Sequence, residues 1–96
     1  MSYKLIFQPS ALKEWKKLDS SIRAQFAKVL ARRLENPHVP AARLHGGLYK
    51  IKLRDAGYRL VYGVRDEELI IYVLAVGRRD KSEVYQVAFG RMRSGD

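Results

Sequence analysis

The fold of this chain is decided by residues 48–76, which read LYKIKLRDAGYRLVYGVRDEELIIYVLAV. Polar and apolar residues alternate in the first two parts of this stretch, and the last part is almost wholly apolar. Alternation with a period of two indicates half-buried strands, whereas a short apolar run suits a central strand that is buried on both faces. Turn-forming residues separate the parts at 55–57 and 66–67. We therefore predict a meander of three strands at residues 48–53, 58–65 and 69–76.

The register of the first hairpin follows from the side chains that must be buried. One face of each of its two strands carries only apolar or aromatic residues, namely Tyr49, Ile51 and Leu53, then Tyr58, Leu60, Tyr62 and Val64. These two faces are expected to meet on the core side, because a slip of one residue would bury cations instead. The register sets Lys52 opposite or diagonal to Arg59. The other face then gathers five cations, Lys50, Lys52, Arg54, Arg59 and Arg65.

The cations on this face have two possible explanations. Alternating lysine and arginine on an exposed strand can be a solvated face that protects a sheet edge. However, like charges that lie opposite each other destabilise a strand pair by roughly 0.2–1 kcal/mol. The sequence offers no Asp, Glu or His on the same face of these two strands to neutralise them, and Arg78 and Arg79 follow the last strand. These observations favour a site that binds an anion.

The rest of the chain supplies one more strand and three helices. We predict a strand at residues 3–8, ended by Pro9, and helices at residues 10–18, 22–35 and 82–92, with Ser10 as the first N-cap and 91–96 as a loose tail. Trp15 and Phe26 are expected in the core. The fold class is therefore α+β: a small, antiparallel-rich twisted sheet, formed by the N-terminal strand and the three-strand meander, packed with two N-terminal helices and one C-terminal helix.

Composition narrows the class of partner. The 96 residues fit one domain, 1–96, and 19 Lys and Arg against 10 Asp and Glu give a net charge of +9. Such a balance points to a polyanion, with nucleic acid ahead of an anionic membrane surface or an acidic protein. No apolar run of about 18 residues and no signal peptide are evident. The absence of cysteine excludes a cysteine zinc site and fits a cytoplasmic protein.

Several strings together resemble the RelE-type toxins of the RelE/ParE superfamily. They are YKIKLR at 49–54, GYRLVY at 57–62, VGRR at 76–79 and SEVY at 82–85, and the likeness extends back to ALKEW at 11–15. The resemblance implies a toxin of a type II toxin–antitoxin system that cuts messenger RNA in the ribosomal A site. It also implies that the cut needs no metal or other cofactor and leaves a 2′,3′-cyclic phosphate and a 5′-hydroxyl.

The resemblance also carries over specific residues. The functional lysines of the family fall on Lys50 and Lys52, its arginines on Arg59 and Arg79, and its C-terminal tyrosine on Tyr85. The chain departs from the family at His45, where the RelE proteins have an arginine. This departure bears on contacts with the ribosome more than on the chemistry.

Cutting RNA by its own 2′-hydroxyl requires groups that hold the phosphate, stabilise charge and move protons. Arginine offers a planar fork to two phosphate oxygens, so Arg59 is expected to clamp the phosphate and Arg79 to stabilise the transition state. Lys52 is the first choice for the base, because neighbouring cations lower the pKa of a lysine. Tyr85 could instead orient the hydroxyl, stack on a base or accept the proton. Lys50 and Arg54 are expected to bind substrate.

Other readings remain open from the sequence. A ParE-like inhibitor of gyrase would share the fold without nuclease activity, and a non-cutting module would bind only RNA or an antitoxin. A ribonuclease built on His38 and His45 is disfavoured, because both lie in an irregular segment without a neighbouring carboxylate. The expected partners are a RelB-like antitoxin, acidic or amphipathic, together with messenger RNA and ribosomal RNA. We expect no membrane partner and no direct reading of DNA sequence except through the antitoxin complex.

Overall fold

The architecture is that of an α+β protein, as the sequence predicts. A computed structural model describes residues 2–78 and 83–94. Its elements, in chain order, are β1 (Lys4–Phe7), α1 (Pro9–Lys16), α2 (Ser20–Glu35), two 3-10 turns (Pro40–Ala42 and His45–Gly47), β2 (Leu48–Leu53), β3 (Tyr58–Arg65), β4 (Ile70–Arg78) and α3 (Glu83–Ser94). No helix in the described part is both long enough and apolar enough to cross a membrane.

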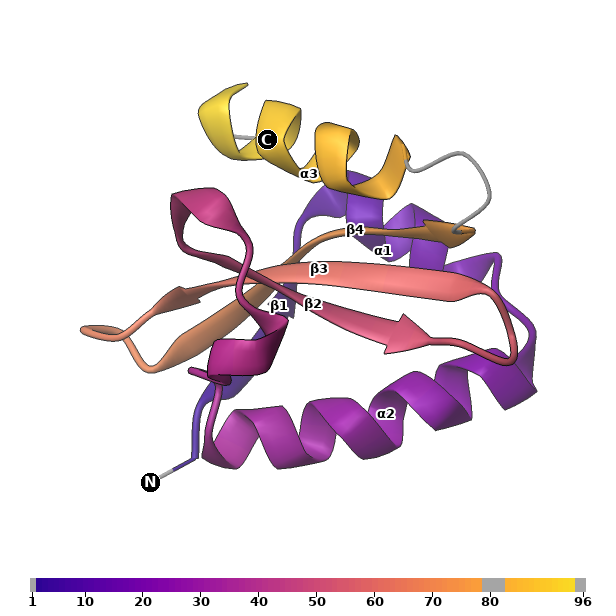
Figure 1. Cartoon of the computed structure of the whole chain (residues 1–96), viewed down its shortest axis with the longest axis horizontal. Coiled ribbons are helices and arrows are strands. Elements are labelled where there is room, and N and C mark those ends of the chain that lie inside the picture. The colour runs from indigo at the N-terminus through magenta and orange to yellow at the C-terminus, as the bar shows by residue number, and fades with distance from the viewer. Residues whose placement is uncertain (1, 79–82, 95–96) are drawn as a thin grey trace.

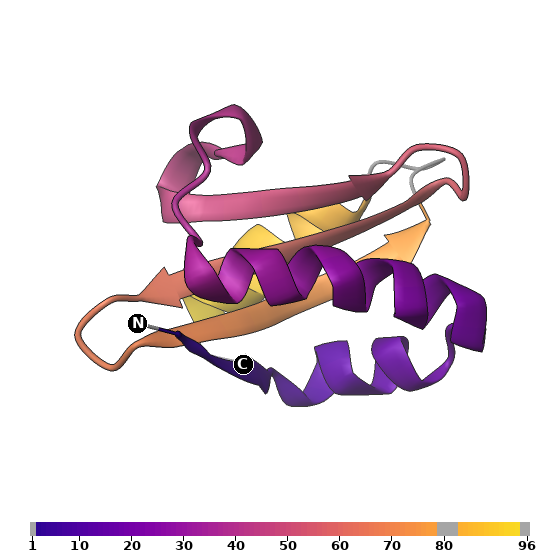
Figure 2. The same cartoon turned by 90° about the horizontal axis from the view of Figure 1, so that it is seen from below.

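The four strands form one mixed sheet in the order β1-β4-β3-β2. The meander β2-β3-β4 is antiparallel, and β1 joins β4 in parallel. Helices α1 and α2 cover one face of the sheet, and α3 covers the other (Figures 1 and 2). The central position of β4, with side chains buried on both faces, confirms the interpretation of its apolar sequence.

The predicted register of the first hairpin is confirmed. Ile51 pairs with Leu60 and Lys52 pairs with Arg59 across β2 and β3. The connecting turn reverses the chain through Gly57, whose φ of 74° lies in the left-handed region that glycine adopts without strain. The cations of the hairpin consequently lie on the same side of the sheet as α3, opposite to the main core.

The main core lies between the sheet and the first two helices. Phe26, Leu60 and Tyr62 are fully buried there, and Trp15 packs against them from α1, so its expected core position is confirmed. Tyr62 also joins several elements. Its hydroxyl donates to the Pro37 carbonyl at 2.8 Å and accepts from Arg33 on α2, also at 2.8 Å.

Strand β4 differs from its predicted extent at both ends. It begins one residue late, because Leu69 has a φ of 56° and closes the preceding turn in a left-handed conformation. It continues past residue 76 to Arg78, since Gly77 still pairs with Arg59 of β3. Within the strand, Leu74 is an extra residue in the ladder to β3, and this bulge turns both Leu74 and Ala75 toward α3.

The helices also show small corrections. Gln8, not Ser10, is the N-cap of α1, because Pro9 occupies the first helical position, where its fixed φ suits the helix and no N–H is required. The helix ends at Lys16, short of the predicted residue 18. At the other end of the chain, α3 continues to Ser94 and Arg91 is held in an ion pair, so the prediction of a loose tail is wrong for residues 91–94.

Tyr62→Phe is expected to reduce the free energy of unfolding by about 1–3 kcal/mol, because the Pro37 carbonyl and the Arg33 guanidinium each lose a buried partner. Urea denaturation followed by circular dichroism measures the change. Tyr72→Phe is the matched control, since in the described part of the chain its hydroxyl makes no hydrogen bond. Equal effects of the two substitutions would contradict the assigned role of the Tyr62 hydroxyl.

Candidate functional site

The candidate site is built from the β2–β3 hairpin. Lys50 and Lys52 extend from β2, Arg54 lies in the turn, and Arg59 follows on β3. Lys52 and Arg59 face each other in the ladder. The turn closes a cavity of about 270 Å³, which is lined by Lys52, Leu53, Arg54, Tyr58 and Arg59. Three of its five lining residues are cations and none is acidic, so it suits an anion.

Helix α3 brings an aromatic residue to this cationic cavity. The guanidinium carbon of Arg59 lies 5.0 Å from the centre of the Tyr85 ring. This cation–π contact joins β3 to the first turn of α3 and orients the guanidinium. Within the described chain, the buried Arg59 Nε and the buried Tyr85 hydroxyl have no hydrogen-bond partner. Buried polar atoms are normally satisfied, so two such atoms on side chains that contact each other indicate a place where a ligand oxygen can bind.

The cations around Lys52 alter its chemistry. The Lys50 ammonium is the largest cause that lowers the pKa of Lys52 below its usual 10.5, followed by partial desolvation and by Arg59 and Arg54. A lowered pKa raises the fraction of neutral amine near neutral pH, and the neutral amine is the form that can accept a proton. Tyr85 changes in the opposite direction. Burial raises the pKa of its phenol above 10.0, although Arg59 opposes the shift.

Arg65 is the predicted cation of the hairpin face that stands apart from the cavity. Arg65 lies on the same face but at the far end of β3, where its guanidinium carbon is 5.0 Å from the centre of the Tyr72 ring and it pairs with Glu68 at 3.8 Å. Its predicted place on this face is confirmed, but it does not line the cavity at the hairpin turn. Arg79 lies outside the described residues. Its neighbour Arg78 ends β4, with its guanidinium carbon 5.6 Å from the centre of the Tyr58 ring.

Sequence reasoning missed a second polar cluster at the opposite end of the sheet. Asp66, in the β3–β4 turn, lies 2.6 Å from His38 Nε2 and accepts a hydrogen bond from the Tyr3 hydroxyl at 2.7 Å. His38 Nδ1 lies 2.9 Å from the Tyr49 hydroxyl. His38 thus does have a carboxylate neighbour, contrary to the sequence interpretation. The contact joins positions 28 residues apart, so no local spacing could have revealed it.

The two histidines do not form a pair. His45 lies in the second 3-10 turn and stacks on Phe89 of α3, with ring centres 4.2 Å apart and planes inclined by 13°. His38 instead binds Asp66 and packs edge-on against Tyr49. His45 therefore contacts helix α3 and His38 contacts the opposite part of the sheet, so the two rings do not share a site.

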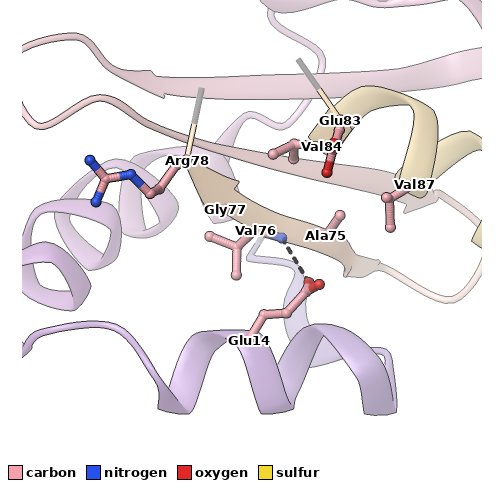
Figure 3. Close-up of a pocket in the computed structure, with 8 residues that line it drawn as sticks. All are labelled: Glu14, Ala75, Val76, Gly77, Arg78, Glu83, Val84 and Val87. Carbon is pink, nitrogen blue, oxygen red and sulfur yellow. Dashed lines mark hydrogen bonds between the residues drawn. The ribbon is translucent and has the colours of Figure 1, made fainter. Parts of the chain in front are cut away.

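A larger cavity of about 440 Å³ opens between α1, the end of β4 and α3 (Figure 3). Two carboxylates, Glu14 and Glu83, line it together with Arg78 and several valines. Negative groups at its wall make it a poor place for a polyanion, so size alone does not identify the functional site. The smaller cavity at the hairpin has the charge that the net basic sequence predicts.

Comparison with known proteins agrees with this fold. Residues 5–83 match the family described as the ParE toxin of the type II toxin–antitoxin system, parDE. A RelE-like toxin protein of Escherichia coli is 56% identical over 95 residues, covering 97% of this chain and all of that protein. The mRNA interferase toxin RelE of Escherichia coli K12 is 50% identical over 94 residues, covering 96% and 99%.

Solved structures show the same similarity to RelE toxins. An arginine-to-alanine double mutant of Escherichia coli RelE in the free state superposes with a TM-score of 0.87 at 49% identity, covering 96% of this chain and 99% of that chain. The same mutant in complex with a peptide of the antitoxin RelB gives 0.79 at 50% identity, covering 92% and 95%. The chain belongs to the RelE/ParE family of toxins from type II toxin–antitoxin systems.

Lys50→Met is expected to raise the pKa of Lys52 toward its usual value, because it removes the largest source of repulsion on that ammonium. A pH titration of the lysine side chains by heteronuclear NMR measures this shift. Lys28→Met is the control. It removes an exposed cation from α2, which covers the other face of the sheet, so it is expected to leave the Lys52 titration unchanged. An unaltered Lys52 curve in Lys50→Met would show that the two ammonium groups do not interact.

Proposed function

We propose that this protein is a toxin that cuts messenger RNA in the A site of translating ribosomes and thereby stops translation. The observation that carries the proposal is the convergence of Lys52, Arg54 and Arg59 on one small cavity, with Tyr85 against Arg59. The name mRNA interferase, which the RelE relative of Escherichia coli bears, supports the same activity. We place the protein in the cytoplasm, where its substrate is.

The cavity suits a single phosphodiester. In the proposed reaction the 2′-oxygen of one nucleotide attacks the adjacent phosphorus while the bond from phosphorus to the 5′-oxygen breaks. A 2′,3′-cyclic phosphate and a 5′-hydroxyl result, and the proton lost by the 2′-hydroxyl is balanced by one gained by the leaving oxygen. Arg59, whose buried Nε has no hydrogen-bond partner among the described residues, is suited to clamp the phosphate oxygens.

The cations of the hairpin divide the remaining roles. Lys52 is the best-suited base, because its lowered pKa supplies neutral amine. Lys50 and Arg54 hold the RNA backbone, and Arg79 stabilises the charge that develops on the phosphate. The raised pKa of Tyr85 disfavours it as a base. We assign it to orienting Arg59 and to stacking on a nucleotide, a contact worth ~1–3 kcal/mol.

The ribosome supplies what this site lacks. A lowered pKa makes more of the neutral lysine amine available but also makes that amine a weaker base, and the cavity is open and small. Alignment of the reacting atoms can replace a large part of the missing chemical assistance, and a strand held in the decoding centre is already constrained. The charge stabilisation comes from lysine and arginine, so we propose that the reaction proceeds without a metal ion.

A RelB-like antitoxin is the proposed protein partner. The RelE relative has been solved with a peptide of RelB, and a net charge of +9 on 96 residues favours an acidic or amphipathic partner. Messenger RNA and ribosomal RNA are the proposed nucleic-acid partners. Any reading of DNA sequence is assigned to the antitoxin in the complex.

Inhibition of gyrase is the second candidate, because the matching family is described by the ParE toxin. Two measurements separate the candidates: primer extension on message bound to translating ribosomes, and DNA supercoiling by gyrase. Cleaved message with normal supercoiling supports the nuclease. Intact message with inhibited supercoiling would replace it by the gyrase inhibitor.

Arg59→Ala is expected to slow cleavage on ribosomes by about 100-fold or more, because it removes the proposed phosphate clamp. Arg59→Lys keeps the charge but loses the planar fork, so it is expected to restore only part of the rate. Arg65→Ala is the control, since Arg65 stacks on Tyr72 far from the cavity. Primer extension with stalled ribosomes measures all three, and wild-type rates in Arg59→Ala would rule out the clamp.

The pH dependence of cleavage tests Lys52 as the base. Below its pKa the neutral amine increases about tenfold for each pH unit, so single-turnover cleavage should rise with pH and then level off. Lys50→Met raises the pKa of Lys52, so the plateau should begin at a higher pH and the rate at neutral pH should fall. A plateau that stays at the same pH in Lys50→Met would assign the proton transfer to another group.

A further inference from the structure

The outer edge of β4 loses its neighbouring strand halfway along its length. Strand β1 ends at Phe7, which pairs with Val73, and the next amide along the chain, Gln8, donates to the Val73 carbonyl at 2.9 Å. Beyond that point β4 continues for five more residues, Leu74 to Arg78. Unpaired backbone groups of a strand require other partners when they are not in water.

Two side chains of opposite charge provide these partners. The Leu74 carbonyl, at the bulge, accepts a hydrogen bond from Arg91 Nη1 at 2.8 Å. The Val76 amide donates to Glu14 Oε1 at 3.2 Å, and Figure 3 shows the Glu14 side chain reaching from α1 to this backbone. Glu14 and Arg91 therefore take the place of a neighbouring strand at the bulge.

The same two side chains join α1 to α3. Arg91 Nη1 lies 2.9 Å from Glu14 Oε1, and Arg91 Nη2 lies 3.0 Å from Glu14 Oε2. The side chain of Arg91 is 18% exposed and that of Glu14 is 34% exposed. Water therefore screens this ion pair less than it screens an ion pair on the surface. A two-point contact between a planar guanidinium and a carboxylate fixes orientation as well as distance.

Fixing Arg91 also fixes Tyr85. The two residues lie six positions apart on α3, about 9 Å along the axis of a rigid helix. Arg91 determines where α3 lies along β4, whereas Tyr85 lies near its other end with its ring centre 5.0 Å from the Arg59 guanidinium carbon. A small shift or rotation of α3 would therefore separate the Tyr85 ring from Arg59.

We propose that Glu14 is a positioning residue for the cationic cavity: through Arg91 it holds α3 so that Tyr85 stays against Arg59. Glu14 does not line that cavity and so acts at a distance. The inference rests on the proposed function for its effect on RNA cleavage. Its structural part, the dependence of the Tyr85–Arg59 contact on Glu14, stands independently of that function.

A merely structural ion pair would behave differently. Loss of such a pair lowers stability, and any loss of activity would then be the same whether or not Tyr85 is present. A positioning role predicts that the effect of changing Glu14 depends on the presence of Tyr85, although the two residues do not touch. A double-mutant cycle between Glu14 and Tyr85 distinguishes the two.

The experiment uses Glu14→Gln, Tyr85→Leu and the double variant, with Glu67→Gln as the control for loss of one carboxylate, since Glu67 is exposed in the β3–β4 turn. Single-turnover cleavage of ribosome-bound message is measured at a temperature at which circular dichroism shows each variant folded. Glu14→Gln is expected to slow cleavage by about 10- to 100-fold when Tyr85 is present. In the Tyr85→Leu background it should change the rate by about twofold or less.

A second measurement reports on position directly. NMR shifts of the Arg59 side-chain protons carry the ring-current effect of Tyr85, and Tyr85→Leu defines its absence. Glu14→Gln should move these shifts toward the Tyr85→Leu values, and Glu67→Gln should leave them in place. If Glu14→Gln fails to fold, Arg91→Lys replaces it, because lysine keeps the charge but gives up the two-point contact.

The outcomes separate the inference from the function. Unmoved Arg59 shifts in a folded Glu14 or Arg91 variant would overturn the inference, as would equal loss of cleavage in both Tyr85 backgrounds. If Tyr85→Leu leaves no measurable cleavage, the cycle cannot be completed, and the Arg59 NMR shifts alone decide whether Glu14 positions Tyr85. Intact message with the wild-type protein would instead refute the proposed function, and the NMR experiment would still test the role of Glu14.

Discussion

Burial of one face of the β2–β3 hairpin is the constraint on which the rest of the molecule depends. Ile51, Leu60 and Tyr62 are almost completely removed from water, and burying an aliphatic side chain of this size contributes about 1.5–3 kcal/mol. Repulsion between directly opposed cations costs only about 0.2–1 kcal/mol. The apolar contacts therefore outweigh the repulsion between Lys52 and Arg59 and hold both on the face that carries the cavity.

The candidate site also contains an aromatic residue, Tyr85, from a segment that is distant from the hairpin in the sequence. Tyr85 belongs to α3, which follows the hairpin by a full strand and packs on the opposite face from α1 and α2. The bulge in β4 turns Leu74 and Ala75 toward α3, and this apolar surface supports the helix that holds Tyr85 against Arg59. The geometry around the cavity at the hairpin turn is thus a product of packing on both faces of the sheet.

The sequence predicts well what depends on periodicity. The bounds of β2 and β3, their register and the central place of β4 all follow from alternation and from apolar runs. The resemblance to RelE-type toxins adds Tyr85, which periodicity alone would assign to packing. Contacts between remote positions could not be predicted in this way. Asp66 with His38, and Glu14 with Arg91, join residues that share no local pattern, and the sequence around Arg91 predicts a loose tail.

The position of β2 at the border of the sheet has one more consequence. An edge strand with free backbone groups and apolar side chains can pair with a strand of another molecule. Lysines along an edge strand make such pairing less favourable. Lys50 and Lys52 place charge along this edge strand, and Arg33 of α2 donates a hydrogen bond to one of its backbone carbonyls, that of Lys50. Exchange of these lysines for apolar residues would therefore remove charge from the cavity and expose an apolar edge strand at the same time, so the same two positions bear on both anion binding and solubility.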